Sequence, residues 1–292
     1  MSMETSINTQ DAVEVCDLLD RAAEGLRVSS VRTGSKVELP DAGRLLITGD
    51  IHDHSDNLRK IIQLAELDAD GDRHLILQEL IHGDRLFNGM DFSYRMALVA
   101  ADLVVQYPDR VHVMLSNHEL AQVNGDSILK AGVSSVDAFN QGIEYIFGEH
   151  EAMVAESLER FVRAMPLAVQ CANGVFCSHS LPSPSRIKAF DASILDREPL
   201  EEDMHGPTGS AYLLVWGRNM KQAVADALAA EWGARVFVCG HQPTDAGYEA
   251  IDETILVINS DDQAGQMLPI DLSTVYTRDE LVERIVPLAS IA

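Results

Sequence analysis

Several residues with nitrogen or oxygen ligand atoms come directly after short apolar runs. His241 follows the run 236–239 and one glycine, and Glu79 follows the run 73–78. Three other apolar runs end in the same way, and the residues that follow them are Asp50, His52, Asn117, His118 and His179. The carboxyl ends of strands in an α/β protein meet at one edge of the sheet, so we expect these side chains to converge.

The types of these residues predict a site for divalent metal ions. Imidazole nitrogen suits zinc, iron or manganese, and carboxylate or amide oxygen suits harder ions. One carboxylate can bridge two ions, and two ions roughly 3.5–4 Å apart polarise a phosphoryl group and lower the pKa of a bound water toward ~7. The pattern therefore favours hydrolysis of a phosphoester by a hydroxide that two metals activate.

The elements that must position these residues alternate between helices and strands early in the chain and pair as hairpins later. The predicted helices cover 11–24, 55–69 with Ser55 as N-cap, 92–108, most of 135–165, and 221–232. The predicted strands cover 44–50, 73–79, 110–117 and 234–240, with a hairpin in 167–180 around Asn173-Gly174 and a closing strand pair formed by 254–260 and 265–272. This order indicates an α/β fold with mixed sheets. Residues 181–209 have little periodicity and predict a long surface excursion.

Composition restricts the partners. The chain has 292 residues, 46% of them hydrophobic, and carries 22 basic against 46 acidic side chains, a formal net charge of −24. Such a surface repels phosphate backbones and anionic lipids, so we expect no nucleic-acid or membrane partner. No apolar run approaches the eighteen residues of a spanning helix, and the first residues do not resemble a signal peptide. We expect a soluble cytoplasmic protein; its oligomeric state stays open.

Five segments, in order, resemble the motifs of the calcineurin-like metallophosphoesterases. They are GDIHDHSDNL, YPDRVHVMLSNHE, VFCSHSLPSP, GHQPTDAGYEA and INSDDQAGQMLPIDL. Within that superfamily they are most similar to the phosphoprotein (Ser/Thr) phosphatase branch and its bacterial relatives. The resemblance implies a four-layer α/β/β/α sandwich with two mixed sheets. It covers about 43–272 of a single domain, 1–292, so that 1–42 are an N-terminal helical extension and 273–292 a C-terminal segment.

The resemblance also implies roles for the ligand residues. Asp50 and His52 would hold the first of two divalent ions, with manganese, iron or zinc expected. The residues that would hold the second ion are Asn117, His179 and His241. Glu79 falls at the position that bridges the ions, and His118 matches the histidine that protonates the leaving group.

The second motif departs from the family pattern. LQELIHG stands where the family has a sequence like LGDYVDRG, so Glu79 replaces the bridging aspartate and His82 replaces the aspartate that partners the catalytic histidine. Gly83 replaces a phosphate-binding arginine, which would remove stabilisation of transition-state charge. In a second register, Asp84 would be the bridge. Arg218 and Arg85 are the candidates for binding phosphate in place of the missing arginine.

These observations predict a metal-dependent phosphoesterase, with His118 and His82 as its catalytic pair. Its substrate would be a phosphorylated small molecule or a phosphoprotein, as in a protein Ser/Thr phosphatase. Two alternatives stay open: a nucleotide or dinucleoside polyphosphate hydrolase, and a catalytically impaired relative that acts as a binding module. The altered second motif favours the last of these, and the retained ligand residues count against it.

Overall fold

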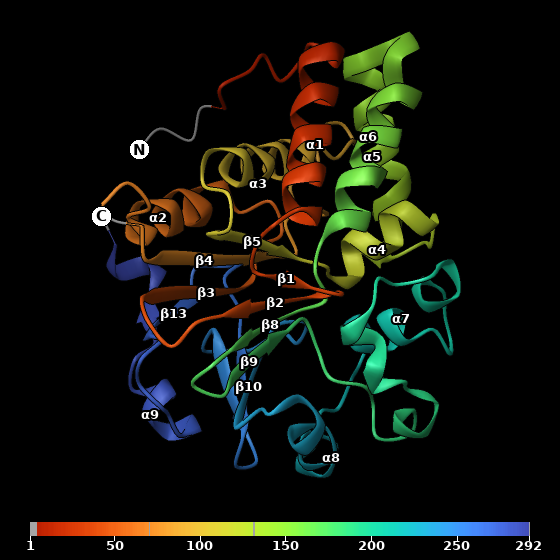
Figure 1. The fold of residues 1–292 in the computed structure, drawn as a ribbon. Helices are drawn as coiled ribbons and strands as arrows, with labels where there is room; N and C mark the ends of the chain where they lie inside the picture. The colour runs from red at the N-terminus through yellow and green to blue at the C-terminus, as the bar shows by residue number, and fades with distance from the viewer. Residues whose placement is uncertain (1–4, 70, 131, 292) are drawn as a thin grey trace.

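Two mixed β-sheets face each other in this computed structural model, which describes residues 5–69, 71–130 and 132–291 (Figure 1). The first sheet has the order β1-β2-β8-β9-β10-β12-β11. Its strands are β1 (Arg32–Thr33), β2 (Lys36–Leu39), β8 (Ala168–Cys171), β9 (Val175–Ser178), β10 (Val236–Cys239), β12 (Ile255–Ile258) and β11 (Tyr248–Ile251). Parallel pairs join β2 to β8, β9 to β10 and β10 to β12, and the other pairs are antiparallel.

The second sheet has the order β14-β13-β3-β4-β5. Its strands are β14 (Val286–Pro287), β13 (Gln266–Asp271), β3 (Arg44–Asp50), β4 (Arg73–Gln78) and β5 (Val111–Met114). Strands β3, β4 and β5 run parallel, and β13 is antiparallel to β3. A separate pair joins β6 (Leu129–Lys130) to β7 (Val133–Ser134).

Helices flank the two sheets. They are α1 (Ala12–Arg27), α2 (Ser55–Ala65), α3 (Tyr94–Gln106), α4 (Asn117–Asn124), α5 (Ser135–Phe147), α6 (Glu151–Ala164), α7 (Ser210–Val215), α8 (Gln222–Trp232) and α9 (Arg278–Val282). In Figure 1, α2 and α3 lie on the side of β4 and β5, with α1 packed against α3 and α6. Helix α8 lies on the other side, beyond β9 and β10, and α7 lies to the right of the strands, next to α4. The layers therefore run helix, sheet, sheet, helix, as expected for the α/β/β/α sandwich.

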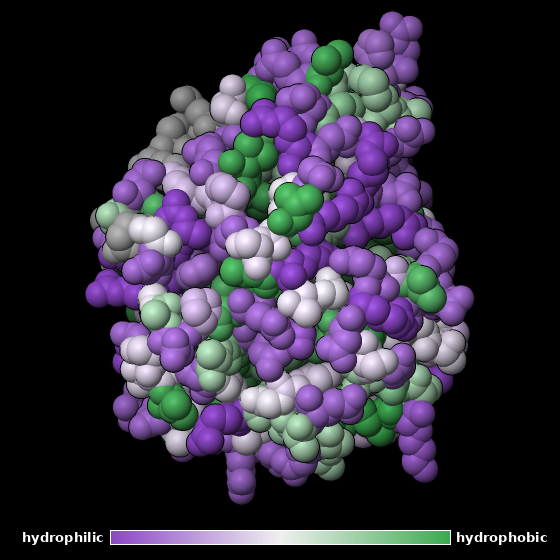
Figure 2. Space-filling view, in the orientation of Figure 1, coloured by the Kyte–Doolittle hydropathy of each residue, from purple (hydrophilic) through white to green (hydrophobic). Residues whose placement is uncertain are grey.

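Alternating side chains of the central strands fill two cores. In β3, Leu45 and Ile47 point into the cluster between the two sheets, while Leu46 points into the cluster under the helices. Both faces of β3 are buried, which explains why its sequence is a continuous apolar run rather than an alternating one. On the outer surface, the face in Figure 2 is largely hydrophilic, with apolar side chains only in small groups.

The closing strand pair was predicted wrongly. Strand β12 pairs with β10 and β11 in the first sheet, whereas β13 pairs with β3 and β14 in the second. The chain changes sheets between them: the backbone N–H of Asn259 donates to Gly247 at 2.8 Å, and that of Ser260 donates to Asp50 at 2.9 Å. Strand β12 is a fully buried apolar run, and β13 is largely buried but begins with Gln266 and ends with Asp271. Neither pattern indicates which neighbour the strand takes.

Some predicted boundaries also differ. Helix α2 ends at Ala65, before Glu66 with φ of 46°, and the side chain of His54, not Ser55, caps its first turn by accepting from Asn57 N. Helix α1 continues through Gly25 to Arg27. The excursion 181–209 contains three short 3-10 helices, η2 (Ile187–Ala189), η3 (Ala192–Asp196) and η4 (Glu201–Met204), while η1 (Gly148–His150) and η5 (Leu288–Ser290) lie elsewhere. No helix among the described residues is both long and apolar enough to cross a bilayer.

Candidate metal centre

The ends of five strands deliver the predicted ligands to one edge of the sandwich. Asp50 is the last residue of β3, Glu79 follows β4, Asn117 begins α4 after β5, His179 follows β9, and His241 follows β10 by two residues. All five are buried, with at most 5% of each residue exposed. His52, two residues beyond β3, lies beside them, with its Nε2 3.5 Å from Glu79 Oε2. The structure thus brings all six predicted metal ligands together.

Asn117 lies at the centre of one set of donor atoms. Its Oδ1 is 2.7 Å from His179 Nε2 and 2.7 Å from His241 Nδ1. Burial lowers the pKa of His241 to about 3 and places the pKa of His179 well below its usual value. Both rings are therefore neutral near pH 7, which is the form that binds a metal ion.

The surroundings of His179 test whether a metal ion fits. Its Nδ1 is 2.8 Å from Gln78 Oε1, and Gln78 Nε2 donates to the carbonyl of Thr48 at 2.8 Å, so the amide oxygen of Gln78 faces the ring. Oxygen atoms thus face both ring nitrogens, yet a neutral imidazole has only one N–H. A cation held by His179 Nε2 and Asn117 Oδ1 would remove this conflict. Gln78 would then orient the His179 ring through its contact with Nδ1.

Glu79 lies between two groups of potential ligands. Atoms of Asp50, Glu79 and His179 lie within 4.8 Å of one another, and so do atoms of His52, Glu79 and His118. Glu79 Oε1 is 3.6 Å from His179 Nε2, whereas its other oxygen, Oε2, makes the contact with His52. Burial raises the pKa of Asp50 to about 6, a cost that a bound cation would offset. Nitrogen and oxygen donors in this mixture suit divalent transition metals.

The backbone around the centre is held in an unusual conformation. Ten described residues other than glycine have positive φ, and five of them lie at this edge: His52, Asp53, Glu79, His82 and His241. Each such residue costs on the order of 1–3 kcal/mol, and such strain clusters at functional sites. The cluster of residues with positive φ therefore supports this edge as the functional site.

His118 and His82, the predicted catalytic pair, lie within hydrogen-bond distance of each other. Their Nδ1 atoms are 3.1 Å apart, and His118 Nε2 is 3.9 Å from Glu79 Oε1, so this nitrogen faces the metal centre. His82 is fully buried, and its ring meets the Phe139 ring edge-on with centroids 5.5 Å apart.

The two arginine candidates differ in position. Arg218 lines a 260 Å³ pocket together with all the predicted metal ligands except His179, and its Nη1 is 3.4 Å from the carbonyl oxygen of His241. Arg85 is 62% exposed and is held outside this pocket, by the carbonyl of Asp53 and by Ser55 Oγ. Asp84 is exposed and, among the described residues, does not line the pocket. The geometry thus favours Arg218 over Arg85, and Glu79 over Asp84.

Two residues that sequence reasoning missed support the centre. One is Gln78, described above. The other is Glu119, whose Oε1 accepts from the backbone N–H groups of Leu80 at 2.8 Å and Ile81 at 3.3 Å. Glu119 thus holds the segment that follows Glu79. The signal available in the sequence was its position two residues after Asn117. A carboxylate buried so close to a predicted ligand needs hydrogen-bond donors, here two backbone N–H groups.

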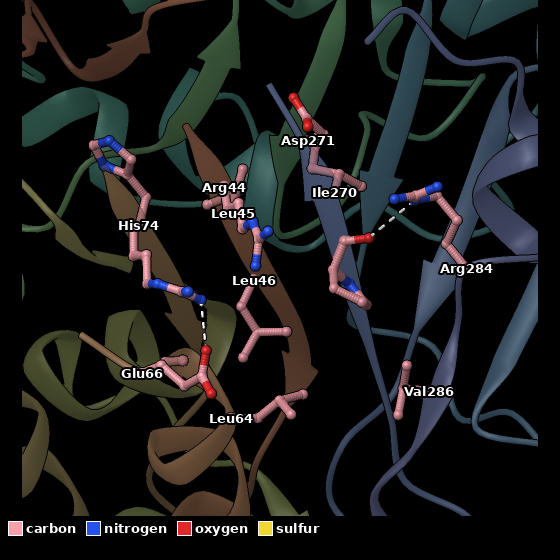
Figure 3. Close-up of a pocket in the computed structure, with 13 residues that line it drawn as sticks. Arg44, Leu45, Leu46, Leu64, Glu66, His74, Ile270, Asp271, Arg284 and Val286 are labelled. Carbon is pink, nitrogen blue, oxygen red and sulfur yellow. Dashed lines mark hydrogen bonds and ion pairs between the residues drawn. The ribbon is translucent and has the colours of Figure 1, made fainter. Parts of the chain in front are cut away.

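A second pocket, of 390 Å³, lies at the opposite edge of the five-stranded sheet (Figure 3). It opens where β3 and β4 begin, and Arg44, His74 and Arg284 are among its lining residues. Arg73 pairs with Glu66 at 2.7 Å, and Arg284 Nε donates to the carbonyl of Pro269 at 3.4 Å. Its lining contains none of the predicted ligands within the described ranges, so the predicted metal ligands and this pocket lie apart.

Comparisons with known proteins agree with this geometry. A model of the calcineurin-like phosphoesterase family matches residues 43–255, more than half of the chain. The fold is similar to that of a Saccharomyces cerevisiae protein serine/threonine phosphatase with similarity to human phosphatase PP5, at 16% identity, TM-score 0.65, and coverage of 89% of this chain and 83% of the other. It is also similar to a cold-active protein-tyrosine phosphatase of a Shewanella species, at 15% identity, TM-score 0.56, and coverage of 86% and 80%. A search of curated proteins finds no match.

Proposed function

The chain belongs to the calcineurin-like phosphoesterase family, and we propose that its metal centre hydrolyses a phosphoric ester. One observation carries the proposal: Asn117 Oδ1 lies 2.7 Å from ring nitrogens of both His179 and His241, next to the carboxylates of Asp50 and Glu79. Family membership alone does not fix a substrate, because function depends on the site.

The residues fit two divalent ions. Asp50 and His52 would hold one ion, and Glu79 would bridge it to a second. The ligands of the second ion would be Asn117, His179 and His241. When bound, two such ions polarise phosphoryl oxygens and lower the pKa of water, and manganese, iron and zinc all suit this mixture of donors.

The remaining residues act on the substrate. Arg218, at the wall of the 260 Å³ pocket, would bind nonbridging oxygens of the phosphoryl group. A water oxygen forms the new bond to phosphorus as the bond to the leaving oxygen breaks, and this water releases one proton to the solvent, from which His118 Nε2 takes up the proton that it delivers. His118 Nε2, which faces this pocket, delivers a proton to the leaving oxygen.

The size of the pocket favours a terminal phosphoryl group on a larger molecule. Ligand pockets typically measure about 300–1,000 Å³, and this 260 Å³ pocket is smaller, so it would hold the phosphoryl end of a substrate whose remainder lies outside. A phosphoprotein or a phosphorylated small molecule meets this requirement.

A specific observation supports a nucleotide or dinucleoside polyphosphate as the second candidate. A 700 Å³ pocket has Asp53, which follows His52 in the chain, together with Arg85, Arg95 and Phe92 in its lining. Arg95 lies 5.7 Å from the centroid of the Phe92 ring. Two arginines and an aromatic ring would suit further phosphates and a base.

The binding-module alternative rests on Gly83. A Cβ added there would lie 2.6 Å from the carbonyl oxygen of His52 and 2.5 Å from Asp53 Cβ. The backbone therefore leaves no room for the family's phosphate-binding arginine at this position, which leaves Arg218 as the arginine in the pocket.

The test is hydrolysis of para-nitrophenyl phosphate and its bis-ester by metal-stripped protein. Manganese, zinc, iron or magnesium is added back, with His241→Ala as control. Metal-dependent turnover that His241→Ala abolishes is expected, and the ratio of mono- to diester rates would separate the substrate classes. Bound metal without turnover on these esters or on nucleoside polyphosphates would support the binding module, and absence of bound metal would overturn the proposal.

A further inference from the structure

A line of hydrogen-bonding side chains leads from His118 away from the metal centre. His118 Nδ1 is 3.1 Å from His82 Nδ1, and His82 Nε2 is 2.9 Å from Gln122 Oε1. Gln122 Nε2 in turn donates to Asn140 Oδ1 at 2.7 Å. Gln122 is on α4, one turn beyond His118, and Asn140 is on α5. The line thus begins at a buried imidazole and ends at an exposed amide.

The positions of the protons follow from the far end of the line. Because Gln122 uses its Nε2 to donate to Asn140, its Oε1 faces His82 and can only accept. A neutral His82 therefore carries its proton on Nε2, and its Nδ1 has a lone pair. That lone pair accepts from His118 Nδ1–H, which leaves His118 Nε2, the atom that faces the metal centre, as the nitrogen that takes and gives a proton.

An imidazole at position 82 needs a second residue to fix its tautomer, whereas a carboxylate at this position would not. A carboxylate accepts through both oxygens, but a neutral imidazole carries its proton on either nitrogen. With the proton on His82 Nδ1, that atom would donate to His118 Nδ1 and reverse the tautomer of His118. The position of His82 does not depend on Gln122, since the residue is fully buried and its backbone N–H donates to Ser93 Oγ at 3.0 Å.

We propose that Gln122, held by Asn140, is a positioning residue that fixes the tautomers of His82 and His118. It would thereby keep His118 Nε2 as the atom that protonates the leaving group. The inference rests on the proposed phosphoesterase function for its catalytic part, but the tautomers themselves do not depend on turnover.

Two substitutions separate this role from a packing role. Gln122→Met keeps the length of the side chain and removes the acceptor, whereas Gln122→Glu keeps an acceptor. Gln141→Met makes the same change at an exposed neighbouring glutamine. Each variant is assayed on phenyl phosphate, whose poor leaving group needs a proton, and on para-nitrophenyl phosphate, whose leaving group does not.

We expect Gln122→Met to lower kcat for phenyl phosphate by about 10- to 100-fold, within the range of general acid catalysis, and for the nitrophenyl ester by less than about threefold, with KM unchanged. Gln122→Glu and Gln141→Met should stay close to the parent on both esters. Equal losses on the two esters, or a Gln122→Glu variant as impaired as Gln122→Met, would overturn the proposal.

Nitrogen NMR provides a readout that does not require activity. Long-range proton–nitrogen spectra of the ¹⁵N-histidine-labelled full chain, kept with diamagnetic zinc, distinguish the two tautomers. We expect His82 as the Nε2–H and His118 as the Nδ1–H form in the parent and in Gln122→Glu, with a mixture in Gln122→Met. The opposite tautomers in the parent would overturn the inference, whereas the expected tautomers in a protein without turnover would refute only the proposed function.

Discussion

Both carboxylate oxygens of Asp50 accept from the backbone N–H of His241, at 2.9 Å each. Asp50 ends a strand of the five-stranded sheet and His241 follows a strand of the seven-stranded sheet, so this contact joins the two sheets at the metal centre. It also explains the glycine before His241. A Cβ on Gly240 would lie only 2.2 Å from Asp50 Oδ1.

Gly240→Ala should therefore damage the centre without changing any ligand. The added methyl group must push Asp50 away from His241, and a ligand displaced by about 1 Å can lower a rate by 10²-fold. We expect bound metal to fall and turnover to slow at least about tenfold, measured by elemental analysis and ester hydrolysis. Gly71→Ala is the control, because a Cβ there meets nothing within 4 Å. Full metal content in Gly240→Ala would contradict the proposed role of Asp50.

Two substitutions, each of which removes one negative charge, distinguish Glu79 from Asp84 as the bridging residue. Glu79→Gln removes a carboxylate that lies 3.5 Å from His52 and 3.6 Å from His179. We therefore expect this variant to lose at least one ion and to turn over substrate about two orders of magnitude more slowly than the parent. Asp84→Asn, on an exposed loop, should keep both ions and the parent's rate. Metal stoichiometry and turnover are measured on the same preparations. The reverse result would make Asp84 the bridge.

Arg218 and Arg85 should differ in their effect on substrate binding. Arg218 lines the 260 Å³ pocket with the ligands, whereas Arg85 lies outside it. A charge-assisted bond to phosphate contributes on the order of 1.5–3 kcal/mol, so Arg218→Ala should lower kcat/KM for a phosphomonoester by about 10- to 100-fold. Arg85→Ala should change it by less than about threefold. Similar losses in the two variants would show that the two side chains share the phosphate.

Residue types at strand ends made most of the centre predictable. Asp50 ends a buried strand, and Asn117 and His241 come shortly after buried strands. These residues lie together in the fold because parallel strands end at one edge. The partners of those strands were not predictable. Neither Ile255–Ile258 nor Gln266–Asp271 has a sequence pattern that indicates its neighbouring strand, and only three-dimensional packing places them in different sheets.

Supporting residues were harder to predict than ligands. Gln78 is a neutral side chain inside a buried strand, and nothing in the sequence indicates that its Oε1 lies 2.8 Å from His179 Nδ1. Gln122 contacts His82 across 40 residues, at 2.9 Å. His54 rather than Ser55 caps α2, because either side chain can accept from the backbone and only the geometry of the turn decides.

His112 should make the protein sensitive to mild acid. It is 2% exposed, and its Nε2 is 3.2 Å from Nδ1 of His74. Burial, followed by the nearby charge of His74, lowers the pKa of His112 to about 3, and burial also lowers the pKa of His74. The ordinary histidine pKa is about 6.5. Between about pH 6.5 and 3 the unfolded chain therefore binds more protons than the folded one, so the free energy of unfolding must decrease as the pH falls through this window.

The size of the decrease in the free energy of unfolding follows from the two pKa values of His112, in the unfolded and in the folded chain. From pH 7 to pH 5, a group with these two pKa values lowers the free energy of unfolding by about 2 kcal/mol, at roughly 1.4 kcal/mol per pH unit below 6.5. Urea unfolding at the two pH values measures it. His112→Gln, whose amide does not titrate, should lose about 2 kcal/mol less than the parent over the same interval, even if it is less stable at pH 7. The control is His150→Gln, at an exposed position, which should keep the parent's pH dependence. A parent and a His112→Gln variant with the same pH dependence would mean that His112 takes up its proton in the folded state as readily as in the unfolded chain.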